Sequence, residues 1–355
     1  MKNIATLVSA LAFVVPSGWL AAPVFAQTAK APYTLTVFAN APKGLSAPDS
    51  IAVLRDRVFV GYGDNHAPDG SDGLSSQIVE FTMDGSVARI YTVLGHNDGL
   101  KVDPVTHLLW AIQNEDANAR LVIINTETQE KNEFFLGTGP HGGGYDDITF
   151  RGCKAYLSAS NPLINPNTAP AIVSVHFDGR RVDLDPVLEG DASAVDIPTG
   201  GTVTLNLQDP DSMTLDPFGN IVLDSQGDQE LIIVSDPGSV HQRALHLPLT
   251  WRTPSGAVAS VEVDDTNYAV SSEGFILFAD KGLNKVYKLT TNAFAPGTAY
   301  TAADGGPFVG TLNFSTGLIT PIVTGVSNPG GLVFVDTSKH DADRDDNPCH
   351  DRDSH

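Results

Sequence analysis

Apolar and polar residues alternate along most of this chain in short runs, and one phrase opens each group of runs. The phrase is a turn, an Asp, a small residue and then alternating apolar positions. It occurs at 48–53, 97–102, 145–150 and 210–215, with a degenerate copy at 329–334. Alternation with a period of two is typical of half-buried β-strands. Each copy is therefore predicted to be the first strand of a repeated unit.

Each of the four full copies is followed by three more strand-like runs. These cover 58–62, 77–82 and 88–93, then 108–112, 121–125 and 132–136, then 155–158, 172–177 and 183–188, and finally 220–224, 231–235 and 243–247. Turn pairs such as Asp84-Gly85 and Asp178-Gly179 separate the runs. Four short strands in a repeat of about 40–50 residues are typical of a β-propeller blade.

The two ends of the repeat region predict how the ring closes. The last run, 332–335, has the character of an innermost strand, and the early run, 33–38, has no inner strand before it. Joining the two ends in one blade would close the ring and hide the sheet edges. A fifth unit is expected near Val258 with the runs 275–280 and 285–290, while 294–325, with a hairpin at 308–314 and 318–323, fits blade five or blade six. We expect an all-β, six-bladed propeller over 27–336, with five or seven blades as alternatives.

The N-terminal 26 residues have the pattern of a secretory signal peptide. Lys2 precedes an apolar run from Ile4 to Val15 that is too short to span a bilayer, and Val24-Phe25-Ala26 resembles a cleavage site. We expect cleavage after Ala26 and a secreted or periplasmic protein without a membrane anchor; an uncleaved N-terminal anchor is the alternative. The acidic, His-containing tail, 337–355, is expected to be disordered.

Cysteine content and net charge limit which disulfides and which binding partners are possible. Cys153 and Cys349 could form one disulfide in an oxidising compartment, and two separate thiols are the alternative. Lys and Arg number 21 against 42 Asp and Glu, which gives a formal net charge of −21. Such a chain repels phosphate backbones and anionic lipid. We therefore expect a monomer that binds a small-molecule substrate or a short ligand, and no nucleic acid.

Propeller geometry predicts where the repeated aspartates lie. The innermost strand of a blade starts at one face beside the central channel, and the second strand returns to that face. Asp49, Asp98, Asp146 and Asp211 should therefore converge on the channel mouth. Neighbouring loops add further polar groups to the same rim: Asp64, His66, His96, Asn97, Asn114, Glu115, Asp116, His141, Asp147, Asn161, Gln226, Asp228 and Asp280.

Carboxylates that meet at close range raise one another's pKa unless a cation lies between them. Oxygen ligands suit hard divalent ions, so Asp49, Asp98, Asp146 and Asp211 predict a metal site. Ca²⁺ is the expected ion, with Zn²⁺ or Mg²⁺ as alternatives. For each single Asp the alternative is a simple Asx-turn.

Two segments resemble a known family. Asn97-Asp98-Gly99-Leu100-Lys101-Val102-Asp103-Pro104 is similar to a motif of the senescence-marker-protein-30/gluconolactonase (SMP-30) family of six-bladed propellers, and Pro210-Asp211-Ser212-Met213, with Asp216, Gly219 and Asn220, is similar to another. The resemblance implies one divalent cation in the channel and hydrolysis of lactones or related esters. It places Asn97 on a ligand or substrate-contact position, Asp211 on the metal-bound carboxylate that also acts as base, and Asp146 or Asp147 on an Asn ligand position. The family's early Glu ligand is missing, so Asp49 would replace it, and Ser212 stands where Gly is usual.

These features predict a metal-dependent lactonase or esterase in which Asp211 is the general base. The alternative is a non-catalytic propeller that binds a peptide, a sugar or a partner protein at the same rim, since NHL-like propellers carry the same Asp-Gly-hydrophobic phrase. A redox or lyase propeller that uses His66, His96 and His141 is a third hypothesis.

Overall fold

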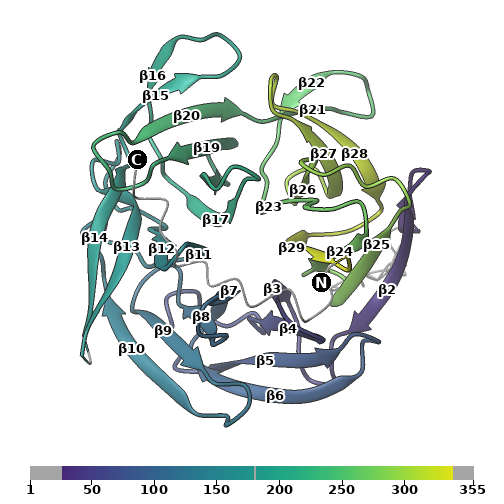
Figure 1. Ribbon diagram of the computed structural model, residues 1–355, viewed down its shortest axis with the longest axis horizontal. Coiled ribbons are helices and arrows are strands. Elements are labelled where there is room, and N and C mark those ends of the chain that lie inside the picture. The colour runs from purple at the N-terminus through teal and green to yellow at the C-terminus, as the bar shows by residue number, and fades with distance from the viewer. Residues whose placement is uncertain (1–25, 180, 339–355) are drawn as a thin grey trace, which may run out of the picture.

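A ring of β-sheets forms the whole of the described structure. The computed structural model describes residues 26–179 and 181–338, and the strands of these residues group into six sheets around a central axis (Figure 1). The innermost strands β3, β7, β11, β17, β23 and β29 contact one another in turn, and β29 contacts β3. The predicted all-β propeller is therefore confirmed. No described residue belongs to a helix, so the described part of the chain has no helix able to cross a membrane.

The first four blades follow the sequence order from the axis outward. Blade one is β3 (Pro48–Leu54), β4 (Arg57–Tyr62), β5 (Ser75–Thr82) and β6 (Val87–Leu94), and blade two is β7 (Asn97–Val102), β8 (Leu109–Gln113), β9 (Ala119–Ile124) and β10 (Lys131–Gly137). Blade three is β11 (Ile148–Arg151), β12 (Lys154–Ser158), β13 (Pro170–Asp178) and β14 (Arg181–Glu189), and blade four is β17 (Pro210–Leu215), β18 (Ile221–Ser225), β19 (Glu230–Ser235) and β20 (Arg243–Pro248). Every strand lies close to its predicted run.

Blades five and six are interleaved along the chain, an arrangement that the repeat pattern does not predict. Blade five is β23 (Asp265–Tyr268), β26 (Ala299–Ala303), β27 (Phe308–Asn313) and β28 (Leu318–Thr324). The hairpin β24 (Gly274–Asp280) and β25 (Lys285–Thr290) lies between β23 and β26 in sequence but belongs to blade six. The assignment of 275–280 and 285–290 to the fifth unit was wrong, because β24 pairs with a strand some fifty residues later in the chain.

The two ends of the described chain close the ring in blade six. Its order is β29 (Pro329–Asp336) innermost, then β24, β25 and β2 (Thr34–Asn40) outermost. β2 runs antiparallel to β25, with Thr34 opposite Thr290 and Asn40 opposite Lys285. The early outer strand and the late inner strand thus lie in one blade, as predicted, and each inner strand of the described residues has a neighbour on both sides in the ring.

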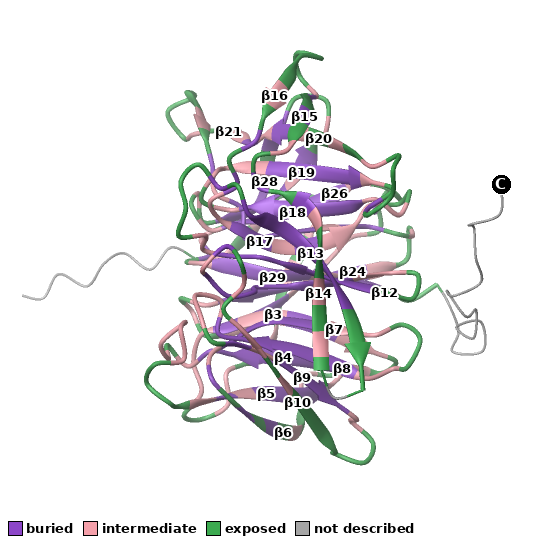
Figure 2. Ribbon diagram, turned by 90° about the vertical axis from the view of Figure 1, so that its left-hand side faces the viewer, coloured by how far each residue is buried: buried purple, intermediate pink, exposed green. Residues whose placement is uncertain are grey.

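Apolar side chains fill the spaces between neighbouring blades. Six buried clusters are found, one at each contact between two blades. The second strands, such as β4 and β18, are buried on both faces because a blade packs against each side. The outer strand β10 is mostly exposed (Figure 2). These clusters fix the blades relative to one another and so fix the residues at the axis.

Small additions extend two blades at their outer edges. β15 (Ser193–Asp196) and β16 (Thr202–Thr204) form a hairpin beside β20, while β21 (Thr250–Arg252) and β22 (Val258–Ser260) form one beside β28. The short β1 (Thr28–Ala29) also pairs with β28. Residues 1–25, which hold almost all of the predicted signal peptide, lie outside the described residues. So do residues 339–355, which hold Cys349 and most of the predicted tail. Cys153 is disulfide-bonded.

Candidate functional site

Five of the six inner strands bring an aspartate to one cavity at the channel mouth. Its volume is about 160 Å³, and it is lined by Asp49, Ser50, Asp98, Glu115, Asp146, Asp211, Ser212, Gln226, Asp264, Lys281, Asp304 and Gly331. The four repeated aspartates therefore meet, as the propeller geometry predicts. Asp264, the residue just before β23, adds a fifth, and in blade six the inner strand contributes Gly331 instead of an acid.

A bulge at the start of three of the inner strands accompanies these positions. The pairing register shifts between Pro48 and Ile51 in β3, between Asn97 and Leu100 in β7, and between Pro210 and Met213 in β17. A bulge reorients the local side chain, and bulges are common beside functional sites. The glycine after Asp98 has a packing reason as well: a Cβ on Gly99 would lie 2.3 Å from the backbone oxygen of Asp146 in the next blade.

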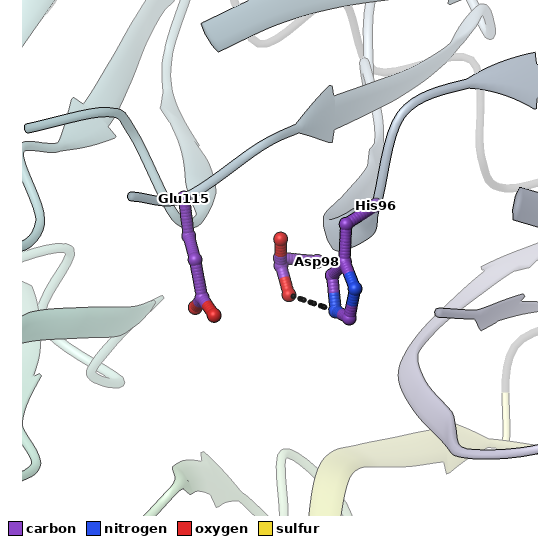
Figure 3. A group of neighbouring side chains, drawn as sticks. All are labelled: His96, Asp98 and Glu115. Atoms are coloured by element: carbon purple, nitrogen blue, oxygen red, sulfur yellow. Dashed lines mark ion pairs between the residues drawn. The ribbon is translucent and has the colours of Figure 1, made fainter. Parts of the chain in front are cut away.

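His96, Asp98 and Glu115 form the one group among the described residues whose ligand atoms lie close enough to share a metal ion. One ligand atom from each lies within 4.8 Å of the other two. Figure 3 shows Asp98 between the imidazole of His96 and the carboxyl group of Glu115. His96 Nε2 lies 3.2 Å from Asp98 Oδ1. Asp98 is only 5% exposed, and its other oxygen, Oδ2, has no hydrogen-bond partner.

Two loops hold the imidazole of His96 in place. The side-chain oxygen of Asn114, which follows β8, accepts a hydrogen bond of 2.9 Å from the backbone N–H of His96. The ring Nδ1 of His96 lies 2.9 Å from the backbone oxygen of His66. Because Nδ1 has a backbone acceptor, Nε2 is directed toward Asp98. Asn114 and His66, both predicted rim residues, thus position the site without lining the cavity.

Burial and mutual repulsion make these carboxyl groups bind protons tightly. Burial, followed by the charge of Glu115, raises the pKa of Asp98 to about 8. Burial, followed by Asp211 and Glu115, raises the pKa of Asp146 well above its ordinary value. Burial would lower the pKa of His96, but the hydrogen bond and charge of Asp98 raise it to about 9. The repulsion that a divalent ion would relieve is therefore present.

A lysine neutralises the other side of the cavity. Lys281, in the loop after β24, places Nζ 3.0 Å from Asp49 Oδ2 and 3.0 Å from Asp264 Oδ1. Burial raises the pKa of Asp49 to about 6, although Lys281 opposes the rise. Burial, followed by Asp264, raises the pKa of Asp211 well above its ordinary value. The cavity thus has a lysine-paired side and a side around His96.

A second polar layer lies deeper along the axis. Lys101 Nζ is 3.1 Å from Asp147 Oδ2, which also accepts a 2.8 Å hydrogen bond from the backbone N–H of Met213. Asp224 accepts a bond from Thr266, and Asp265 accepts one from the backbone N–H of Leu332. Asp147, predicted at the rim, therefore belongs to this buried layer rather than to the cavity lining.

Several predicted rim residues hold loops together instead of facing the cavity. Asp64 accepts a hydrogen bond from the Ser46 backbone, and Asp280 accepts bonds from the backbone N–H groups of Leu283, Ser327 and Asn328. His141 is buried with Nε2 bonded to the Gly144 oxygen, and Asn161 donates to Asp116. Asn97 donates to the backbone oxygen of Ile112 and packs against Gly61. None of these side chains lines the cavity, so Asn97 is not positioned as an expected metal ligand.

Asp264, Asp304 and Lys281 are the cavity residues that sequence reasoning missed. Asp264-Asp265 repeats the doublet Asp146-Asp147 and follows Asp211 by 53 positions, close to the spacing of the other copies. This signal was hidden because β23 reads Asp-Thr-Asn-Tyr and lacks apolar alternation. Lys281 follows Asp280, which was predicted at the rim, but the sequence gives no sign that the lysine rather than the aspartate faces the axis.

Comparisons with known proteins relate this chain to other propellers. No protein-family model matches it, and no curated protein does. Among solved structures it is similar to virginiamycin B lyase from Staphylococcus aureus, with 12% identity, 73% of this chain and 99% of that chain covered, and a TM-score of 0.44. It is also similar to a periplasmic gluconolactonase from Pseudomonas aeruginosa, with 12% identity, 81% of this chain and 88% of that chain covered, and a TM-score of 0.43. A gluconolactonase from Xanthomonas campestris has 11% identity, with 85% of this chain and 82% of that chain covered, and a TM-score of 0.46. At these identities the likeness concerns the β-propeller fold alone.

Proposed function

We propose that this protein is a metal-dependent hydrolase that acts on a small lactone or ester at the channel mouth. The observation that carries the proposal is the His96–Asp98–Glu115 group, whose ligand atoms lie within 4.8 Å of one another. The buried, unpartnered Oδ2 of Asp98 supports it, because a buried carboxylate oxygen without a partner is costly. Both observations fit a divalent cation at this point.

The donor set suggests which ion to test first. The sequence favoured Ca²⁺, whose ligands are oxygens. An imidazole among the ligands suits Zn²⁺ better, and carboxylates also suit Mn²⁺ and Mg²⁺. His96, Asp98 and Glu115 would hold the ion, with Asp146 beside Glu115. We therefore propose Zn²⁺ first, then Mn²⁺, with Ca²⁺ and Mg²⁺ as comparisons.

The chain's own residues would then divide the reaction between them. The bound ion would supply polarisation of the scissile carbonyl. Asp211, on the blade-four side of the cavity, would accept the proton of the attacking water as general base. The raised pKa of Asp211 suits that role, because a general base accepts a proton from water more readily when its pKa lies nearer the working pH. The small, polar cavity of about 160 Å³ would admit only the reacting part of a substrate.

The metal content of the purified chain tests this function. We expect one ion per chain, loss of lactone or ester hydrolysis in EDTA, and recovery when Zn²⁺ or Mn²⁺ is added. Asp98→Asn should weaken metal binding at least about tenfold, whereas Asp211→Asn should abolish turnover and keep the ion. Asp183→Asn, which removes an exposed carboxyl group on β14, is the matched control and should change neither. A chain that binds no ion, with hydrolysis indifferent to EDTA, would contradict the proposal.

A non-catalytic binding module is the second candidate function. The ion pairs of Lys281 with Asp49 and Asp264 favour it, since they neutralise two cavity carboxylates without any metal. In that case the chain would bind a small ligand at the same channel mouth, and it would hydrolyse none of the lactones or esters tested, even with an ion bound. For either function we propose a monomer that works in the periplasm or outside the cell, as the N-terminal pattern predicts.

A further inference from the structure

Lys281 is the one lysine or arginine among the described residues that line the cavity. Seven carboxyl groups line the same space: Asp49, Asp98, Glu115, Asp146, Asp211, Asp264 and Asp304. The side chain of Lys281 is 28% exposed and makes two ion pairs of 3.0 Å, to Asp49 and to Asp264. Its ammonium group is therefore a cation that lies between the carboxyl groups of Asp49 and Asp264.

The carboxyl groups around Lys281 are held by other contacts as well. Asp264 Oδ2 accepts a hydrogen bond of 3.2 Å from the backbone N–H of Gly331. Gln226 Nε2 donates to Asp264 Oδ1 at 3.4 Å and to Asp304 Oδ2 at 3.1 Å. The position of Asp264 is thus set by the backbone and by a neutral side chain, and it should persist without the lysine.

The other side of the cavity has no lysine or arginine among its described residues. Asp98 pairs only with His96 among the described residues, and no described lysine or arginine pairs with Glu115 or Asp146. The seven acids therefore surround two places suited to positive charge. One lies between Asp49 and Asp264 and is filled by Lys281; the other lies at His96, Asp98 and Glu115.

We propose that Lys281 takes the place of a second divalent ion and thereby limits the cavity to one metal, at the His96 side. This inference rests on the proposed metal site. Both carboxyl oxygens lie 3.0 Å from the same nitrogen, so without the ammonium group they face one point, in a cavity that Asp211 also lines. Unpaired buried carboxylates are strongly unfavourable, and a divalent ion of the kind proposed for the first site would relieve them.

Metal stoichiometry tests this role without reference to activity. Lys281→Met removes the charge and keeps much of the apolar stem, while Lys281→Arg keeps the charge and is the matched control. Equilibrium dialysis with Zn²⁺ and with Mn²⁺, followed by elemental analysis, should give one ion per chain for the wild type and for Lys281→Arg. For Lys281→Met we expect two. A folded Lys281→Met variant that still binds one ion would overturn the inference.

A double variant separates the inference from the proposed function. Lys281→Met combined with His96→Ala weakens the first site and leaves the second, so we expect it to bind one ion. If the wild type binds none and the double variant binds one, the proposed function fails and the position of Lys281 is still a cation site. If the double variant binds none while the wild type binds one, the inference fails alone. Lys281→Gln, whose amide can still donate to a carboxylate, replaces Lys281→Met should the latter not fold, with the same expected stoichiometry.

Discussion

At the scale of single residues, burial decides the protonation of the channel aspartates. Asp265 lies in the deeper layer, where burial raises its pKa from 3.8 to about 8 although Lys101 opposes the rise. A carboxyl group whose pKa is raised by folding favours the folded state while protonated. Its contribution is complete below about pH 4 and is lost as the pH rises through about 8. The folded state should therefore weaken across this range.

Asp265→Asn should flatten this pH dependence. In EDTA the Tm of the wild type should fall between pH 5 and pH 8.5, and the variant should lose at least about 5 °C less over the same range, since one pKa unit corresponds to about 1.4 kcal/mol. The hydrogen bond from the Leu332 backbone can be kept by the amide oxygen. Differential scanning calorimetry measures the effect, with Asp183→Asn as control. Equal pH slopes for Asp265→Asn and the wild type would show that Asp265 does not titrate in this range.

Single residues also show which parts of the candidate site could be predicted from the sequence. The convergence of Asp49, Asp98, Asp146 and Asp211 could be predicted because each lies at the start of an inner strand or just before it, and inner strands share an axis. The partners of these residues could not be. The approach of Lys281 to Asp49 depends on which side chain of a loop turns inward. His96 becomes a potential ligand only because Asn114 and the His66 backbone fix its ring.

At the scale of the element, the turn that starts β29 depends on two glycines. Gly331 has φ +45°, and a Cβ there would lie 1.9 Å from the backbone oxygen of Asp49 in the adjacent blade. A Cβ on Gly330 would lie 2.3 Å from Asp264 Oδ2. The first inner strand and the last can approach so closely only because this segment lacks side chains.

Gly331→Ala should therefore destabilise the protein more than an alanine at an open turn. Gly219, in the turn after β17, has φ +81° and no atom within 4 Å of a Cβ, so Gly219→Ala should cost only the left-handed backbone penalty of about 1–2 kcal/mol. Gly331→Ala adds a backbone clash and should cost at least about 2 kcal/mol more. Urea unfolding of both variants gives the difference. Similar losses for the two variants would mean that β29 can move away from β3.

Strand positions in blades one to four could be predicted because neighbouring strands in sequence are neighbours in space. Blades five and six break this rule. The hairpin β24–β25 leaves blade five after β23 and pairs with β29 and β2, which lie far away along the chain. Period-two alternation locates a strand but says nothing about a partner so distant. The polar strand β23 hides the start of blade five for a different reason, because its inward residues serve the channel.

At the scale of the whole molecule, the cavity exists only when the ring is closed. Blade six supplies Lys281 and Gly331, and its outer strand β2 comes from the opposite end of the described chain. Phe38 of β2 also makes an edge-to-face contact with Phe81 of blade one, with ring centroids 6.1 Å apart. Without β2, the edge of β25 would be left unpaired and blade six would lose part of its packing on blade one.

Deletion of residues 27–41 should therefore damage stability and metal binding together. We expect a fall in Tm of about 10 °C or more, since a strand and several buried apolar side chains are lost. Deletion of 27–31 removes only β1 and is the control, with a fall of a few degrees at most. The distinctive result is that the two effects occur together: Asp98→Asn should weaken metal binding and keep its Tm in EDTA, whereas the 27–41 deletion should lower both metal binding and Tm. If the deleted chain keeps its ion and its Tm, then blade six holds its place through β24 and β29 alone, and β2 merely covers an edge.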